Sequence, residues 1–156
     1  MRKKYIFVVF IFIYVTALCI YLYNTAIMNT DFVVWCKTIS ASDLDVVHWN
    51  FYADTITQSD ELSTSEKQQI SEILNNLQRR DIKVIKAGTG APSVPDQTLY
   101  LSSNETRYIL QYSLAKPKFI YVLTDYDEAI KDPWGIRGHI WITNKELISL
   151  FLSKLS

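Results

Sequence analysis

Hydrophobic residues form one long run near the N-terminus and several shorter runs after it. Residues 5–23 contain no charge, glycine or proline, and twelve of these 19 positions are Ile, Leu, Val or Phe. At roughly 1.5 Å per residue, a helix of this length spans about 28 Å, close to the roughly 30 Å hydrocarbon core of a bilayer. The run therefore predicts a transmembrane helix, and the alternative is a buried helix of a soluble core.

Basic residues beside this run predict its orientation. Arg2, Lys3 and Lys4 precede it, and the next basic residue is Lys37. Because positive charge is retained on the cytoplasmic side, we expect a cytoplasmic tail at 1–4, a signal-anchor helix at 5–23, a short tether at 24–31 and an extracytoplasmic domain over 32–156. The lipid bilayer is then the partner of the apolar helix.

The apolar run also has some features of a cleaved signal. Secretory signals share the basic start but have a shorter apolar region, about 7–15 residues, followed by a small-x-small cleavage site. Val15-Thr16-Ala17 lies inside the run, and Asn24-Thr25-Ala26 fits the site poorly. A lipoprotein would use Cys19, but Leu18 stands where a small residue is needed. We therefore expect a retained anchor rather than secretion after cleavage.

Beyond the tether, the pattern alternates between strand and helix signals. Five apolar residues from Leu62 to Leu77 recur at helical spacing and predict a helix at 64–80, which Ser63 and Glu66 open as a capping box. A similar box begins at Thr143 and predicts a short helix at about 144–155. Alternating or β-branched runs predict strands at 32–39, 46–53, 82–87, 97–101, 106–113, 119–124 and 138–142. The expected fold is α+β: a small antiparallel sheet with one long helix packed on it and a short C-terminal helix.

Charge excludes one class of partner. The 156 residues carry 16 basic and 16 acidic side chains, but three of the basic ones lie in the tail. The rest of the chain therefore has 13 basic and 16 acidic residues, a net charge of −3. Nucleic-acid binding normally needs a basic face, so we expect no nucleic-acid partner.

Two loops resemble ligand-binding motifs but depart from them. Gly88-Thr89-Gly90 could begin a phosphate loop, yet Ser93 stands where a dinucleotide fingerprint needs its third glycine. The acidic loop over 125–132 could supply oxygens to calcium, but Ile130 and Ile136 occupy positions that an EF-hand reserves for glycine and a bidentate acid. We therefore expect no cofactor and no metal, and interpret both segments as solvated loops.

The chain also lacks a recognisable catalytic motif. His48 and His139 are its only histidines, and neither has Cys, His or carboxylate partners at ligand spacing. Cys36 lies between Trp35 and Lys37, outside any known nucleophile context. We therefore expect no catalytic residues. The alternative is an envelope enzyme whose site is assembled in space from His48, His139, Cys36 or the acidic loop.

Aromatic residues in the predicted sheet and its loops favour a binding role. Aromatic side chains are common both in strands and at protein interfaces. If the long helix covers only one face of the sheet, the other face could present aromatic side chains to a protein or envelope component. The candidate partner-binding residues are Tyr108, Tyr112, Tyr121, Trp134 and Trp141. Ordinary core packing is the alternative for each.

Several segments carry a family resemblance: EILNNLQRR at the end of the long helix, the PSVPD loop, the RYILQY strand, and Ile142 followed by Glu146-Leu147-Ile148. Over roughly residues 60–152 the chain resembles small extracytoplasmic domains of unknown function from Gram-positive bacteria, attached to signal anchors or lipoprotein signals. The resemblance implies no catalytic residues. We therefore expect a single-pass membrane protein with a non-catalytic outer binding domain. A further alternative is an accessory or immunity subunit that pairs with a membrane partner through Thr16 and Ala17.

Overall fold

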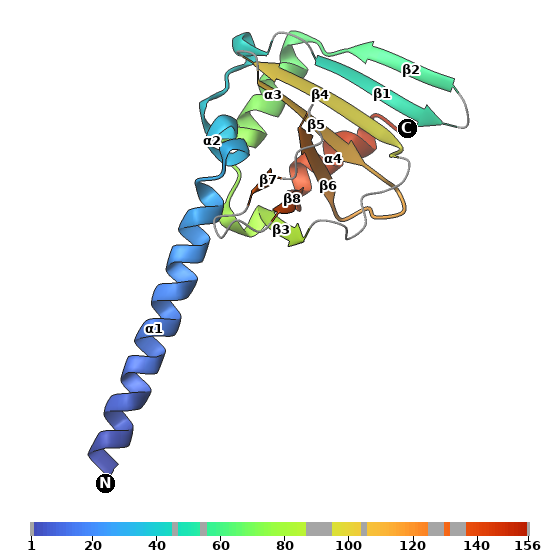
Figure 1. The fold of residues 1–156 in the computed structure, drawn as a ribbon. Coiled ribbons are helices and arrows are strands. Elements are labelled where there is room, and N and C mark those ends of the chain that lie inside the picture. Colours follow the sequence, from blue (N-terminus) through green and yellow to red (C-terminus); the bar gives the residue numbers. More distant parts are fainter. Residues whose placement is uncertain are drawn as a thin grey trace.

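The chain folds as an α+β domain carried on a long N-terminal helix (Figure 1). The computed structural model describes residues 2–44, 47–53, 56–86, 95–103, 106–124, 130–131 and 137–155. Side chains are described in these ranges except at 2–4, 47–53, 56–60, 86, 124, 130–131 and 137–138. The predicted fold class is confirmed.

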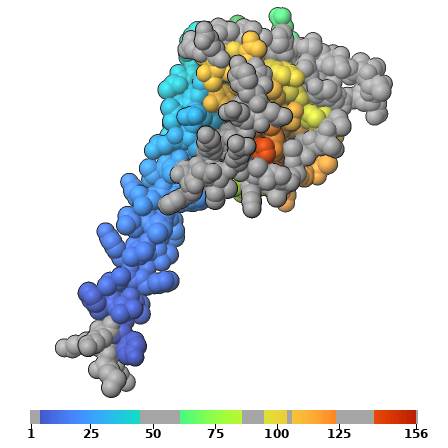
Figure 2. Space-filling view, in the orientation of Figure 1, coloured from blue at the N-terminus to red at the C-terminus, as the bar shows by residue number. Residues whose placement is uncertain are grey.

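Helix α1 (Arg2–Met28) projects from the domain as a rod (Figure 2). The large apolar side chains from Tyr5 to Tyr23 are exposed, and the segment Tyr5–Met28 is long and apolar enough to cross a membrane. The predicted tether differs from the structure at its start, because the helix continues through residues 24–28 and Ile27 is fully buried. The end of α1 is therefore part of the domain's packing.

The prediction of a strand at 32–39 is wrong. These residues lie mainly in helix α2 (Asp31–Thr38), in which Phe32, Val33 and Cys36 are fully buried. Their β-branched and aromatic content favours a strand, but helix propensities differ by only about 0.7 kcal/mol per residue. Burial of one apolar face against the sheet outweighs that difference.

All pairings in the sheet are antiparallel, and the strand order is β2-β1-β4-β5-β6-β8-β3, with β7 paired to β8. The strands are β1 (Val47–Ala53), β2 (Ile56–Glu61), β3 (Ile82–Lys86), β4 (Gln97–Ser103), β5 (Thr106–Tyr112), β6 (Ile120–Thr124), β7 (Ile130–Lys131) and β8 (Arg137–Ile142). Strands β2 and β7 were not predicted, since ITQSDE has little apolar content and β7 has two residues. Backbone pairing to β1 and β8 forms them instead.

Two further helices pack on the sheet. Helix α3 (Thr64–Asn75) begins with the predicted capping box: the Glu66 amide donates to Ser63 Oγ, and the Ser63 amide donates to Glu66 Oε2 at 2.9 Å. It ends five residues before the predicted end at residue 80, and a 3-10 turn, η2 (Arg79–Asp81), leads into β3. Helix α4 (Lys145–Ser153) is capped by Asn144.

The core lies between the helices and one face of the sheet. Alternation in β5 and β6 directs Leu110 and Val122 to this face, beside Ile140 of β8. Ile70 of α3 and Phe151 of α4 are fully buried against it. The next side chain along each strand points to the opposite face, which none of the described helices occupies (Figure 1).

Candidate functional site

The base of α1 is fixed to the domain by polar contacts. Arg79 of η2 donates from Nε to Asn24 Oδ1 at 2.9 Å, and its guanidinium lies 5.8 Å from the centre of the Tyr23 ring. A second guanidinium nitrogen donates to the Ile82 carbonyl at 2.7 Å. Together with buried Ile27, these contacts join the apolar helix to the start of β3.

Aromatic side chains gather on the sheet face opposite the helices. Trp141 of β8 lies 4.7 Å from Phe119 and 5.9 Å from Tyr121, measured between ring centres. Tyr121 lies 5.0 Å from His139. Cross-strand pairing produces the cluster, because Tyr121 is the direct partner of Trp141 in the β6–β8 register.

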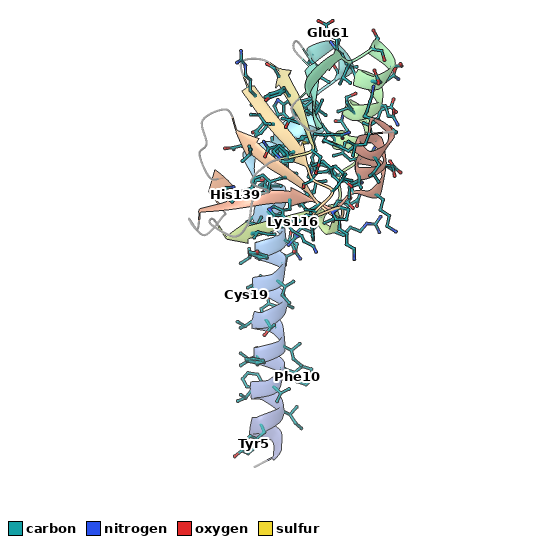
Figure 3. The ribbon with its side chains drawn as sticks, turned by 90° about the vertical axis from the view of Figure 1, so that its right-hand side faces the viewer. Tyr5, Phe10, Cys19, Glu61, Lys116 and His139 are labelled. Carbon is teal, nitrogen blue, oxygen red and sulfur yellow. The ribbon has the colours of Figure 1, made fainter. Side chains whose placement is uncertain are left out.

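Two lysines lie over this cluster. Lys83 Nζ is 5.3 Å from the centre of the Phe119 ring, and Lys116 Nζ is 5.2 Å from that of Trp141. An ammonium group at this distance is attracted to the negative face of an aromatic ring. We call Lys83, Lys116, Phe119, Tyr121, His139 and Trp141 the lysine–aromatic surface. Figure 3 shows Lys116 and His139 at the end of the domain from which α1 leaves, far from Glu61.

An open groove of about 540 Å³ adjoins this surface. Lys83, Lys118 and Lys145 line it, with Phe119, Thr143 and Ser149. Its volume is typical of sites for small ligands. Three cations and an apolar wall can bind an anionic group attached to an apolar body.

The structure divides the predicted partner-binding aromatics between two faces. Tyr108 and Tyr112 belong to the core beneath the helices, so the prediction that they face a partner is wrong for both. Strand alternation places them there, beside Leu110. Burial, with smaller contributions from Asp31 and Cys36, raises the pKa of Tyr108 to about 12.

The other three predicted aromatics have different positions. Tyr121 and Trp141 lie on the lysine–aromatic surface but are 3% and 7% exposed, so little of either ring is available to a partner. Phe119 and His139 beside them are half-buried. Trp134 lies outside the described residues. Sequence reasoning missed Phe119 and both lysines, although Phe119 lies directly between Lys116-Pro117-Lys118 and the start of β6.

The candidate catalytic residues whose positions the structure describes, Cys36, His48 and His139, are not brought together. Cys36 is fully buried on the helix-covered face, where burial raises the pKa of its thiol above the usual range. His139 precedes Ile140 of the core in β8 and therefore lies on the other face. His48 is in β1, four strands from β8, which corresponds to about 19 Å at about 4.8 Å per strand.

The predicted loops fall partly outside the described residues. Residues 87–94, which contain Gly88-Thr89-Gly90, are not described, and neither are residues 125–129 and 132 of the acidic loop. Among the residues whose positions are described, no group of three or more His, Cys, Asp or Glu side chains lies within reach of one metal ion.

Comparison with known proteins gives a structural neighbour. No known protein family and no curated protein sequence matches the chain. A crystal structure provisionally designated a lipoprotein, from Clostridium perfringens, superposes with a TM-score of 0.48 at 10% identity, over 73% of this chain and 87% of the neighbour. A likeness at this level carries no argument about function.

Proposed function

We propose that the chain is a single-pass membrane protein with its N-terminus in the cytoplasm, whose outer domain binds a protein or envelope component without catalysis. The proposal depends on a contrast in side-chain exposure along α1. Its large apolar side chains from Tyr5 to Leu22 are exposed, whereas Ile27 is fully buried in the domain. A bilayer is the environment that matches this pattern.

The contacts of Arg79 support a domain held directly on the bilayer surface. A helix from Tyr5 to Asn24 spans about 30 Å at about 1.5 Å per residue, which places Asn24 at the outer interface. Arg79 bonds to Asn24, so η2 and the start of β3 lie beside the lipid headgroups. The domain then works within a fixed distance of the membrane.

The burial and contacts of the described side chains support a binding role without catalysis. Cys36 is buried with a raised pKa, and His139 contacts an aromatic ring. The lysine–aromatic surface offers cations and half-buried rings, which are features of recognition sites. We therefore assign partner contact to Phe119 and His139 rather than to the buried rings beside them.

Photocrosslinking in intact cells tests the partner. A photoreactive phenylalanine analogue at Phe119 is expected to give a specific crosslinked species, and the same analogue at Leu152, which is 43% exposed on α4, is the control. Equal patterns from the two positions, or no product at Phe119, would count against a partner on this surface. Carbonate washing of the membranes tests the anchor separately, since release of the chain would contradict a retained span.

A further inference from the structure

The groove beside the lysine–aromatic surface lies close to the base of α1. Thr143, which lines it, donates from its backbone amide to the Asp81 carbonyl at 2.7 Å and from Oγ1 to the Arg80 carbonyl at 3.3 Å. The neighbouring residue in η2, Arg79, is bonded to Asn24 at the end of the apolar span. The groove is therefore connected to the membrane helix through one short turn of backbone.

The walls of the groove combine positive charge with apolar surface. Lys83, Lys118 and Lys145 are exposed, and no carboxylate is among the described residues that line the groove. Lys83 is positioned by the Phe119 ring, and no ion pair joins it to a carboxylate among the described side chains. The helix α4 begins here and adds the positive end of its dipole. Asn144 Oδ1 already accepts hydrogen bonds from the amides of Glu146 and Leu147. These two amides are therefore occupied, and the helix contributes the electrostatic field of its dipole.

This local positive charge contrasts with the net charge of the exported domain as a whole. Beyond the N-terminal tail, the chain has 13 basic and 16 acidic residues. Three lysines around one groove are therefore a concentration of positive charge on a mildly acidic domain. Basic residues next to a membrane span attract anionic headgroups over a distance of about one Debye length, roughly 8 Å at physiological salt.

We propose that this groove binds the phosphate-bearing headgroup of an anionic phospholipid in the bilayer that α1 crosses. Lys83, Lys118 and Lys145 contact the phosphate, and the hydroxyls of Thr143 and Ser149 are available as donors to its oxygens. Phe119 and Ile148 line the same groove and cover the upper part of the apolar acyl chains, below the glycerol esters. That apolar wall favours a lipid over a free phosphate ion. The inference rests on the proposed membrane attachment and adds a lipid preference to it.

Lipid retention by the full chain tests the inference. The chain is placed in nanodiscs containing phosphatidylglycerol and phosphatidylcholine, transferred to mild detergent, and examined by native mass spectrometry for retained lipid. The wild type is expected to retain phosphatidylglycerol in preference to phosphatidylcholine. Each lysine near the surface is worth about fivefold in affinity, so Lys83→Gln, Lys118→Gln and Lys145→Gln together should reduce this preference by about 100-fold.

Matched variants separate the groove from general charge and from folding. Arginine at all three positions keeps the charge and should keep the preference, and Lys37→Gln on α2 should leave it unchanged. Equal unfolding temperatures of the glutamine variant and the wild type in phosphatidylcholine nanodiscs show that the fold is intact. An unchanged preference in a folded glutamine variant would overturn the inference.

Two other outcomes are distinguishable. If glycerol phosphate or inorganic phosphate binds the chain in pure phosphatidylcholine nanodiscs and, in the mixed nanodiscs, displaces phosphatidylglycerol, the groove is a site for a soluble anion and the lipid assignment is wrong. If carbonate washing releases the chain from cell membranes, the proposed anchoring fails. A chain that stays in the membrane but retains no anionic lipid refutes the groove alone.

Discussion

Ile27 is the residue that joins the membrane helix to the folded domain, and its truncation tests that junction. Its side chain is fully buried, whereas Ile20, two turns earlier on α1, is 57% exposed. Replacing a buried Ile by Ala costs about 2–5 kcal/mol, because methylene groups are lost and the cavity collapses only in part. For a domain of this size, about 3 kcal/mol corresponds to a fall in Tm of about 10 °C.

The assay compares Ile27→Ala with Ile20→Ala. Replacing Ile by Ala raises the helix propensity by the same small amount at both positions. The difference between the two Tm values therefore reports the burial of Ile27. Thermal unfolding in nanodiscs, followed by the near-ultraviolet circular dichroism of the aromatic side chains, is expected to show the lower Tm only for Ile27→Ala. Equal Tm values for the two variants would refute the packing of α1 into the core and favour the short tether at 24–31 that the sequence alone predicted.

Three further predictions follow from individual contacts. Ser63→Ala should destabilise the domain by about 1 kcal/mol in urea unfolding, since it removes the cap of α3, and Ser63→Asp should restore most of the loss. Hydrogen bonds from Lys154 and Ser63 lower the pKa of Glu66 to about 2 from the ordinary 4.5, so the stability due to ionised Glu66 is present above pH 4.5 and is lost as the pH falls towards 2. Glu66→Gln should flatten the pH dependence of Tm in that window, and an unchanged slope would contradict the assignment. Burial raises the pKa of Cys36, so in a Cys19→Ser chain its thiol should react with a maleimide only on unfolding, and rapid labelling of the folded chain would contradict its position in the core.

Local signals in the sequence predicted the elements that depend on local interactions. The apolar run predicted α1, the Ser63–Glu66 box predicted the start of α3, and the runs at 97–101 and 106–113 predicted the neighbouring strands β4 and β5. In each case the interactions that form the element lie within a few residues or between neighbouring strands.

Elements that depend on distant contacts were missed. Helix α2 contains strand-forming residues, and its helical form depends on packing of Phe32 and Trp35 around Tyr108, with ring centres 5.0 and 4.8 Å away. Strand β2 has a polar sequence and exists through its pairing with β1. Neither interaction is visible in a local window.

The candidate site was only partly predictable for the same reason. Residue type and strand context identified Tyr121 and Trp141 as candidates, but they did not predict that both rings are buried. Lys83 reaches the surface because β3 pairs with β8 and sets Lys83 opposite Trp141. That register joins residues far apart in the sequence, so the groove and its lysines could be found only from the fold.

Labelling of intact cells, followed by measurement of the intact mass, tests the retained anchor and the outer domain most directly. A chain with Cys19→Ser and Lys118→Cys is expressed in Gram-positive cells, treated with a membrane-impermeant maleimide before lysis, and recovered from carbonate-washed membranes. The expected product is the full-length chain carrying one label. Labelling only after lysis would contradict the outward orientation of the domain, and a shortened labelled product in the medium would contradict the retained anchor.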